Sequence, residues 1–381
     1  MRFWPWQRRL PTAPFTSSDL LLGEDLVRAG VGEVLAIDDG QIRGATAVYR
    51  GRLRLPPARA LERLEARLRP LGLTPFLRTE GDEVLVQAVP MAGVVRPRRV
   101  VLNVLLFVLT CVTTLVSGAL FFSSRTFAPS DTWPLAAAIL SGVPFAATLL
   151  AILGVHEFGH YFTARYYRAS VSLPYFIPAP PIFLFGTLGA IISMRSPARN
   201  RNSLFDIAAA GPLAGLVVAI PAILFGLAWS AVGPVPPGEA IRFGDPLLLR
   251  LFVYLTFGSI PAGMDVFLHP VAIAGWAGFF VTALNLFPVG QLDGGRIAYA
   301  LFGRRHRLVG MLTVAATLAL GLVTWSPNWF VWAALVIFLI GFHHSPPLDD
   351  VTPLSAGRRA VGALCLVLFI LLIPPVPIEI T

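Results

Sequence analysis

The sequence predicts an α-helical polytopic membrane protein with about seven transmembrane spans, a re-entrant or strand-like segment and a small N-terminal α/β domain. Of its 381 residues, 55% are hydrophobic and 13% are charged, about half the charged fraction of a typical soluble domain. Several apolar runs reach the length that the hydrocarbon core of a bilayer requires. The arginines are also distributed unevenly between the segments that join these runs. These observations exclude a soluble globule, a disordered chain and a disulfide-rich scaffold.

The first 98 residues contain no apolar run long enough to cross a membrane. Residues 41–54 alternate as a strand does, and residues 56–69 have the apolar spacing of a helix that begins at prolines. Two more strands are predicted at 73–79 and 83–89, on either side of a turn. Residues 1–98 are therefore predicted to form a soluble cytoplasmic α/β domain, which is a candidate binding site for a regulator.

Seven later runs are predicted to span the membrane. They are 100–122, about 134–167, 203–232, about 270–287, 308–325, 329–342 and 361–378. The run at 171–194 is interrupted by prolines and glycines, which predicts a re-entrant or strand-like segment sheltered by protein. Residues 247–257 are about half the required length and contain Arg250, so we expect an interfacial helix.

The distribution of arginine predicts the orientation of these spans. The sequence contains no lysine, so its 30 basic residues are all arginine, and the formal net charge is +9. With the N-terminus in the cytoplasm, 27 arginines fall in cytoplasmic segments, and Arg125, Arg242 and Arg250 fall on the other side. This is the bias of the positive-inside rule. The arginines form no basic stripe with interleaved aromatic residues, so nucleic acid is not an expected partner.

Two histidines four residues apart, His156 and His160, lie within the second predicted span. On a helix both imidazoles project from one face and can bind one Zn²⁺. Glu157 lies beside them, where it can take a proton from a metal-bound water and deliver it to a leaving amine. The alternative is a set of polar residues that lines a helix contact. Ionisable groups are costly inside a membrane, so metal binding is the favoured interpretation.

A catalytic zinc site needs a third protein ligand and an open position for water. Residues 285–295 contain a proline, three glycines and Asp293 at the end of an apolar run, and such helix breakers are tolerated only at a sheltered or watered cavity. Asp293 lies three residues before Arg296, and His160 lies eight before Arg168, so both lie toward the same face of the membrane. Asp293 is therefore the candidate third ligand, and a turn-forming Asp-Gly pair is the alternative.

Two separated motifs resemble the site-2 protease family of zinc intramembrane metalloproteases. They are His156-Glu157-Phe158-Gly159-His160 and, far downstream, Asn285-x-x-Pro288 with Leu292-Asp293-Gly294. The resemblance implies that His156, His160 and Asp293 bind one catalytic zinc ion and that Glu157 is the catalytic base. It further implies that Asn285 orients the substrate or stabilises the oxyanion, although an asparagine in a span can also simply form a hydrogen bond between helices.

The resemblance covers roughly residues 100–305. An N-terminal α/β region followed by such a core resembles the subgroup of chloroplast ethylene-dependent gravitropism-deficient and yellow-green-like proteins and their bacterial relatives. The resemblance implies a membrane-embedded zinc protease core at 99–305, followed by C-terminal transmembrane helices at 306–381. The segment 186–190 resembles the family's glycine-containing strand or loop near the site, and the strand-like region around it is a candidate clamp for an unwound substrate.

The function that this resemblance implies is intramembrane endoproteolysis. A zinc-dependent enzyme of this kind cleaves a peptide bond in or near a transmembrane helix of a membrane protein, so the expected partners are that substrate and the lipid bilayer. The expected location is a bacterial cytoplasmic (inner) membrane. One alternative is a non-catalytic protease-like scaffold, although the ligand set is intact. Another is a transporter, although the sequence contains no internal repeat of the kind that transporters often have.

Overall fold

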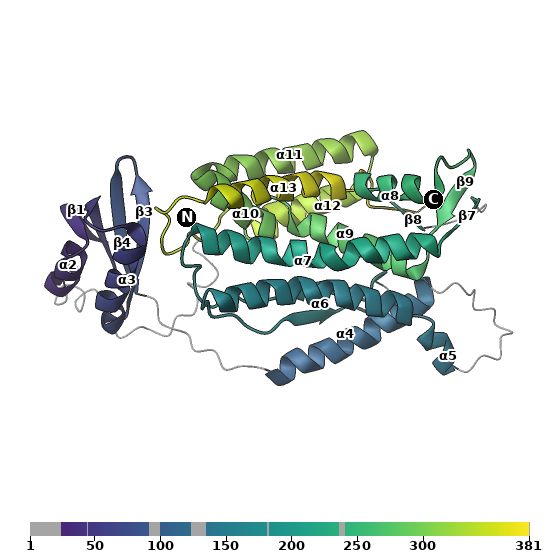
Figure 1. Cartoon of the computed structure of the whole chain (residues 1–381), viewed down its shortest axis with the longest axis horizontal. Helices are drawn as coiled ribbons and strands as arrows, with labels where there is room; N and C mark the ends of the chain where they lie inside the picture. The colour runs from purple at the N-terminus through teal and green to yellow at the C-terminus, as the bar shows by residue number, and fades with distance from the viewer. Residues whose placement is uncertain are drawn as a thin grey trace. The chain divides into compact units, whose positions relative to one another are not determined.

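The computed structural model describes residues 24–43, 45–90, 100–122, 135–180, 183–235 and 241–380. The chain divides into two compact units, and Figure 1 labels their helices and several of their strands. The first contains Met1–Arg98, Arg195–Leu204 and Ser345–Ser355, and the second contains Arg99–Met194, Phe205–His344 and Ala356–Thr381.

The described part of the first unit is a four-stranded antiparallel sheet with two helices packed on it. Its elements are α2 (Glu24–Gly32), β1 (Leu35–Arg43), β2 (Thr46–Leu53), α3 (Pro57–Leu68), a 3₁₀ turn (Arg69–Leu71), β3 (Leu73–Glu80) and β4 (Glu83–Pro90). The strand order is β1-β2-β4-β3. Val27 and Val31 of α2 and Leu61, Leu64 and Leu68 of α3 are fully buried in its core.

Two features of this unit correct the sequence prediction. The single strand expected at 41–54 covers the end of β1 and all of β2, which pair as a hairpin, because alternation of polar and apolar residues continues from one strand into the next. Helix α2 was not predicted, since nine residues are too few for a clear helical periodicity. The helix at 56–69 and the strands at 73–79 and 83–89 are confirmed.

Two short segments from later in the chain extend the sheet beyond β3. The amide of Leu77 donates to the carbonyl of Leu348 at 2.7 Å, and the amide of Asp350 donates to the carbonyl of Leu77 at 2.9 Å. The amide of Leu348 donates to the carbonyl of Ala198 at 2.9 Å. Leu348 is 7% exposed and belongs to the same hydrophobic core as the helices, so the core of this unit depends on residues far from the N-terminal region.

The second unit is mainly helical. Its helices are α4 (Val100–Phe121), α5 (Leu135–Leu140), α6 (Val143–Tyr166), α7 (Arg201–Ala228, whose first turn belongs to the first unit), α8 (Leu247–Phe257), α9 (Pro270–Asn285), α10 (Asp293–Phe302), α11 (His306–Thr324), α12 (Pro327–Leu335, extended by a π turn at Val336–Ile340) and α13 (Ala356–Leu372). Three two-stranded antiparallel sheets join them: β5 (Tyr175–Pro178) with β6 (Thr187–Ile191), β7 (Ala231–Pro234) with β9 (Met264–Phe267), and β8 (Ile241–Phe243) with β10 (Ile378–Ile380).

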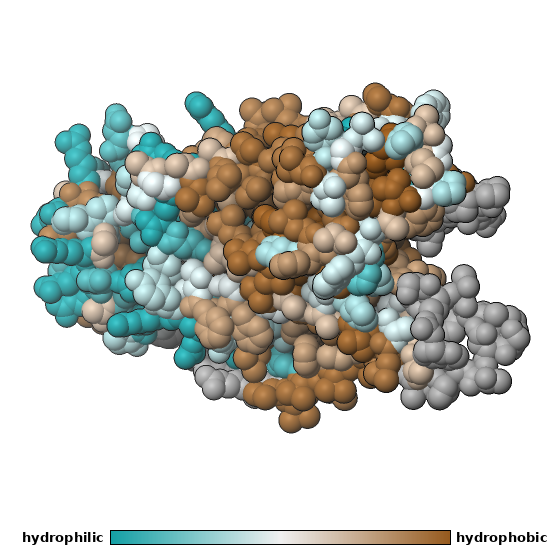
Figure 2. Space-filling model, turned by 45° about the vertical axis from the view of Figure 1, so that its right-hand side comes forward, coloured by the Kyte–Doolittle hydropathy of each residue, from teal (hydrophilic) through white to brown (hydrophobic). Residues whose placement is uncertain are grey.

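Among the described residues, four helical segments are long and apolar enough to cross a membrane. They are α4, α6, α7 and the continuous segment of α10 and α11 at Asp293–Thr324. Helix α9 has 16 residues, about 24 Å of helix, which is shorter than the roughly 30 Å hydrocarbon core. Large apolar side chains cover the surface of this unit, for example Val101 at 82% and Phe338 at 87% exposure, and Figure 2 shows its hydrophobic surface. Such a surface is that of a membrane protein.

Several predicted spans differ from the helices that the structure contains. The run at 134–167 is two helices, α5 and α6, and its first residue and Arg125 lie outside the described residues. The helix predicted at 361–378 begins at Ala356 and ends at Leu372, before two prolines that cannot continue it. The segment 171–194 contains the hairpin of β5 and β6, which confirms the strand-like prediction. The predicted number of seven spans stays a prediction.

Candidate metal centre

The candidate ligands of the second predicted span lie on α6, a 24-residue helix. Helical geometry places side chains four positions apart on one face. His156, Glu157 and His160 are 3%, 5% and 4% exposed. Ionisable groups this deeply buried are stable only with partners, and both histidines have one in Asp293.

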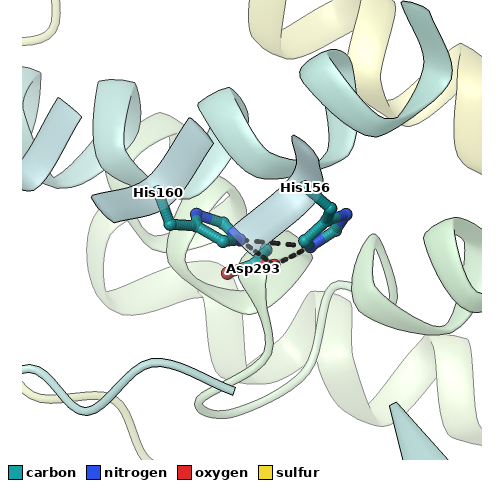
Figure 3. A group of neighbouring side chains, drawn as sticks. All are labelled: His156, His160 and Asp293. Atoms are coloured by element: carbon teal, nitrogen blue, oxygen red, sulfur yellow. Dashed lines mark hydrogen bonds and ion pairs between the residues drawn. The ribbon is translucent and has the colours of Figure 1, made fainter. Parts of the chain in front are cut away.

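Asp293 is the first residue of α10. Its Oδ2 atom lies 3.1 Å from Nε2 of His160 and 3.7 Å from Nε2 of His156. The two Nε2 atoms are 3.2 Å apart. Figure 3 shows the three side chains converging from α6 and α10. The fold therefore brings together residues from the two separated motifs.

The three separations fit one tetrahedral zinc ion. Zinc binds histidine nitrogens and carboxylate oxygens at roughly 2.0–2.2 Å, so two ligand atoms of a tetrahedron lie about 3.3–3.6 Å apart. The observed values of 3.1, 3.2 and 3.7 Å bracket this range. Three protein ligands leave a fourth position for water, as in catalytic zinc sites. Among the residues that the structure describes, no second group of three such donors could hold a metal ion.

Helix α7 orients the ring of His160. Nδ1 of His160 lies 2.6 Å from the carbonyl oxygen of Ile207. Because a carbonyl can only accept, Nδ1 carries the proton, and Nε2 keeps the lone pair that a metal requires. A hydrogen bond of this kind fixes both the tautomer and the direction of a ligating histidine.

Glycines of α7 allow this close approach. A Cβ atom on Gly211 would overlap the His160 ring, and one on Gly215 would lie 3.2 Å from Nδ1 of His156. Neither glycine was predicted from the sequence to have a role. The Gly-x-x-x-Gly spacing of Gly211 and Gly215 is the signal that could have found them, since small residues four apart let membrane helices pack closely.

A polar network next to Ile207 links three helices. Asp206 of α7 accepts two hydrogen bonds from Arg358 of α13, each 2.7 Å long. It also accepts a hydrogen bond from the hydroxyl of Tyr167, at the end of α6. These contacts hold the ends of α6, α7 and α13 together beside the residue that orients His160.

Asn285, the last residue of α9, also lies at the site. Its Nδ2 atom is 3.1 Å from Nε2 of His156, 129 positions away in the sequence. The loop after Asn285 folds tightly onto the first turn of α10, where a Cβ atom on Gly294 would overlap the carbonyl of Leu286. This tight loop is what brings Asp293 back to the end of α9.

Glu157 lies outside the group of three converging donors. It is buried on α6, and its carboxyl accepts a hydrogen bond from the backbone of Ile192, the residue that follows β6. Glu157 therefore connects the metal-binding face of α6 to the β5–β6 hairpin.

Comparison with known proteins identifies the family of the helical unit. Residues 144–325 match the family described as Peptidase family M50. The chain carries an M50 peptidase domain, the domain of the site-2 proteases. The matched range contains His156, Glu157, His160, Asn285 and Asp293.

Curated relatives have names that agree with this family. The chain is 34% identical over 261 residues to the "Probable zinc metalloprotease EGY1, chloroplastic" of Oryza sativa subsp. japonica, covering 67% of this chain and 44% of that protein. It is 32% identical over 261 residues to the EGY1 protein of Arabidopsis thaliana, with 67% and 47% covered. The "Probable zinc metalloprotease EGY2, chloroplastic" of Oryza sativa subsp. indica is 28% identical over 351 residues, with 87% and 61% covered.

The chain spans about half the length of the first curated relatives that it matches. No solved structure matches it significantly.

Proposed function

We propose that this protein is a zinc-dependent intramembrane endopeptidase that cleaves a peptide bond in or near a transmembrane helix of another membrane protein. The observation that carries the proposal is the convergence of His156, His160 and Asp293, with separations that fit one zinc ion, on a helix that also carries a buried glutamate. In this proposal the three residues are the zinc ligands, and zinc, when bound, polarises the scissile carbonyl and acidifies a water.

Glu157 is proposed as the general base and acid. It is the neighbour of one ligand and lies three positions before the other, but it is not one of the converging donors. It is therefore free to take a proton from the attacking water and to deliver it to the leaving amine. The backbone of Ile192 donates a hydrogen bond to its carboxyl.

Asn285 is proposed to orient the substrate or to stabilise the oxyanion. Its amide group lies next to His156 and within the site, and a side-chain amide there can donate to the oxygen on which charge develops. The alternative role, a hydrogen bond that only joins α9 to α6, predicts the same contact but no effect on turnover.

A helical substrate must unwind locally, because its carbonyls are occupied by backbone hydrogen bonds. Strand β6 is paired with β5 on one side, and it ends beside Glu157. An unwound substrate segment is proposed to pair with β6, which would place its backbone next to the catalytic glutamate.

The proposal extends to the arrangement in the membrane. We place the N-terminus and residues 1–98 in the cytoplasm and count seven spans, on the basis of the 27-to-3 arginine distribution. A bacterial cytoplasmic membrane is the proposed location, regulated intramembrane proteolysis the proposed process, and the N-terminal unit the proposed binding site for a regulator.

The substitution Glu157→Gln tests the function. It should abolish cleavage and leave the zinc content near that of the wild type, because the residue is a base and not a ligand. The measurement compares membrane proteomes of cells making the wild type and the variant, with a search for a membrane protein that accumulates only in the variant. Glu379→Gln, the same change on β10, is the control. Cleavage at the wild-type rate by Glu157→Gln would exclude the proposed mechanism.

A further inference from the structure

An apolar pocket opens beside the metal centre, between α6, β6 and α9. Leu149 and Leu153 of α6 form one wall, and Phe280, Val281 and Leu284 of α9 form another. Phe185 and the first three residues of β6, Thr187–Gly189, form the third. The three walls come from three separate parts of the helical unit.

Each wall leads directly to the metal centre. Leu153 lies three positions before His156 and four before Glu157, so these side chains are neighbours on one helix face. Leu284 immediately precedes Asn285, whose amide is 3.1 Å from His156. Along β6 the strand runs from the pocket to Ile192, whose backbone contacts Glu157. The pocket is therefore about one helical turn from the catalytic groups.

The side chains that line the pocket offer no free polar group to a ligand. Thr187 is its one polar side chain, and its hydroxyl donates to the carbonyl of Ile177 at 2.8 Å and accepts from the amide of Gly189 at 3.0 Å. A polar or charged group placed there would be desolvated without compensation. The chemistry of the lining therefore selects an apolar occupant.

The size of the pocket matches one large side chain. Its volume is about 140 Å³, close to that of an apolar cavity of ~150 Å³ that accommodates benzene. A substrate segment paired with β6 would have side chains spaced about 3.3 Å apart along its backbone. A side chain that enters the pocket would thus belong to a residue within about two positions of the bond beside Glu157.

We propose that this pocket is a specificity subsite, which binds a large apolar side chain, of the size of leucine or phenylalanine, close to the scissile bond of the substrate. The subsite rests on the proposed protease function, and it adds a requirement for the substrate's sequence near the scissile bond. Val281 is the residue of the wall best suited to a test, because it is half-buried and can be enlarged or reduced at one position.

The experiment uses the full-length protein in proteoliposomes and a set of single-span peptides that differ at one residue near the cleavage site. Cleavage sites are mapped by mass spectrometry, and only cuts absent with Glu157→Gln are counted. At one position within two residues of the cut, a peptide with leucine or phenylalanine should be cleaved by the wild type with a kcat/KM roughly 10-fold or more above that of the alanine peptide. This follows because one methylene group in an apolar pocket changes the ratio of two substrates' kcat/KM values about 10- to 200-fold.

Two changes at one position should move this preference in opposite directions. Val281→Phe fills the pocket and should reduce the preference for a large side chain by about tenfold, whereas Val281→Ala should shift it toward phenylalanine. Val217→Phe, the same enlargement at a 72% exposed position of α7, should change nothing.

The outcomes separate the two proposals. Glu157-dependent cleavage with a residue preference that neither Val281 variant changes would overturn the subsite and leave the protease intact. An absence of Glu157-dependent cuts, both in the peptides and in membranes of cells that make the protein, would overturn the protease function and the subsite with it.

Discussion

Replacing Gly211 by alanine should displace His160, although the change adds a single methyl group. A Cβ atom at Gly211 would overlap the His160 imidazole, and Nε2, the atom proposed to bind zinc, is the nearest atom. Helix α7 has no room to retreat without breaking its hydrogen bond from His160 to Ile207. The two helices are already in contact there, since a Cβ atom on Gly159 would lie 2.7 Å from the carbonyl of Ala210.

The expected loss follows from the cost of overpacking. An extra methyl group in a closely packed interior costs about 1–3 kcal/mol, and each 1.4 kcal/mol is a factor of ten. If the imidazole moves to relieve the overlap, most of this cost falls on metal binding. Zinc affinity should therefore decrease about 5- to 150-fold, in line with the 10- to 100-fold effects that follow when the orientation of a ligating histidine is disturbed.

The assay is competition for zinc between the purified protein and a chromophoric chelator, together with peptide cleavage at saturating zinc. Gly154→Ala is the matched control, because Gly154 lies on α6 near the site and its Cβ would have no heavy atom within 4 Å. Alanine is also the better helix former, by about 1 kcal/mol. Equal zinc affinity and activity in both variants would refute the argument that Gly211 determines the position of His160.

Three further predictions test the ligands, the orientation and the first unit. Asp293→Ala should lower zinc affinity on the order of 100-fold or more, beyond what changes to residues outside the ligand set usually produce. Asn285→Ala should instead retain zinc and lose turnover. Metal analysis and cleavage rates measure both effects, and unchanged zinc binding in Asp293→Ala would contradict the ligand set. In a cysteine-free background, an impermeant thiol reagent should label Ser259→Cys but not Ser196→Cys in intact cells, and the reverse pattern would invert the proposed topology. Leu348→Ala should lower the unfolding free energy of the first unit by about 2–5 kcal/mol. The loss should appear as faster limited proteolysis of residues 24–90, and an unchanged rate of proteolysis would show that this core does not need Leu348.

Local patterns along the chain determine several features of this protein without reference to its tertiary structure. The spacing of His156 and His160 places two imidazoles on one helix face whatever surrounds the helix, and the long apolar runs indicate a membrane protein. The helix at 56–69 and the hairpin of β3 and β4 were predictable for the same reason. Each follows from sterics and backbone hydrogen bonds between residues a few positions apart.

The sequence could name Asp293 as a candidate but could not show that its carboxylate lies 3.1 Å from His160. That distance depends on the tight loop before α10 and on the packing of α6 against its neighbours. The role of Gly211, the network around Asp206 and the insertion of Leu348 into the core of the first unit are likewise visible only in the tertiary structure. Such contacts join residues far apart in the chain, and their energies depend on shape complementarity that no local periodicity encodes.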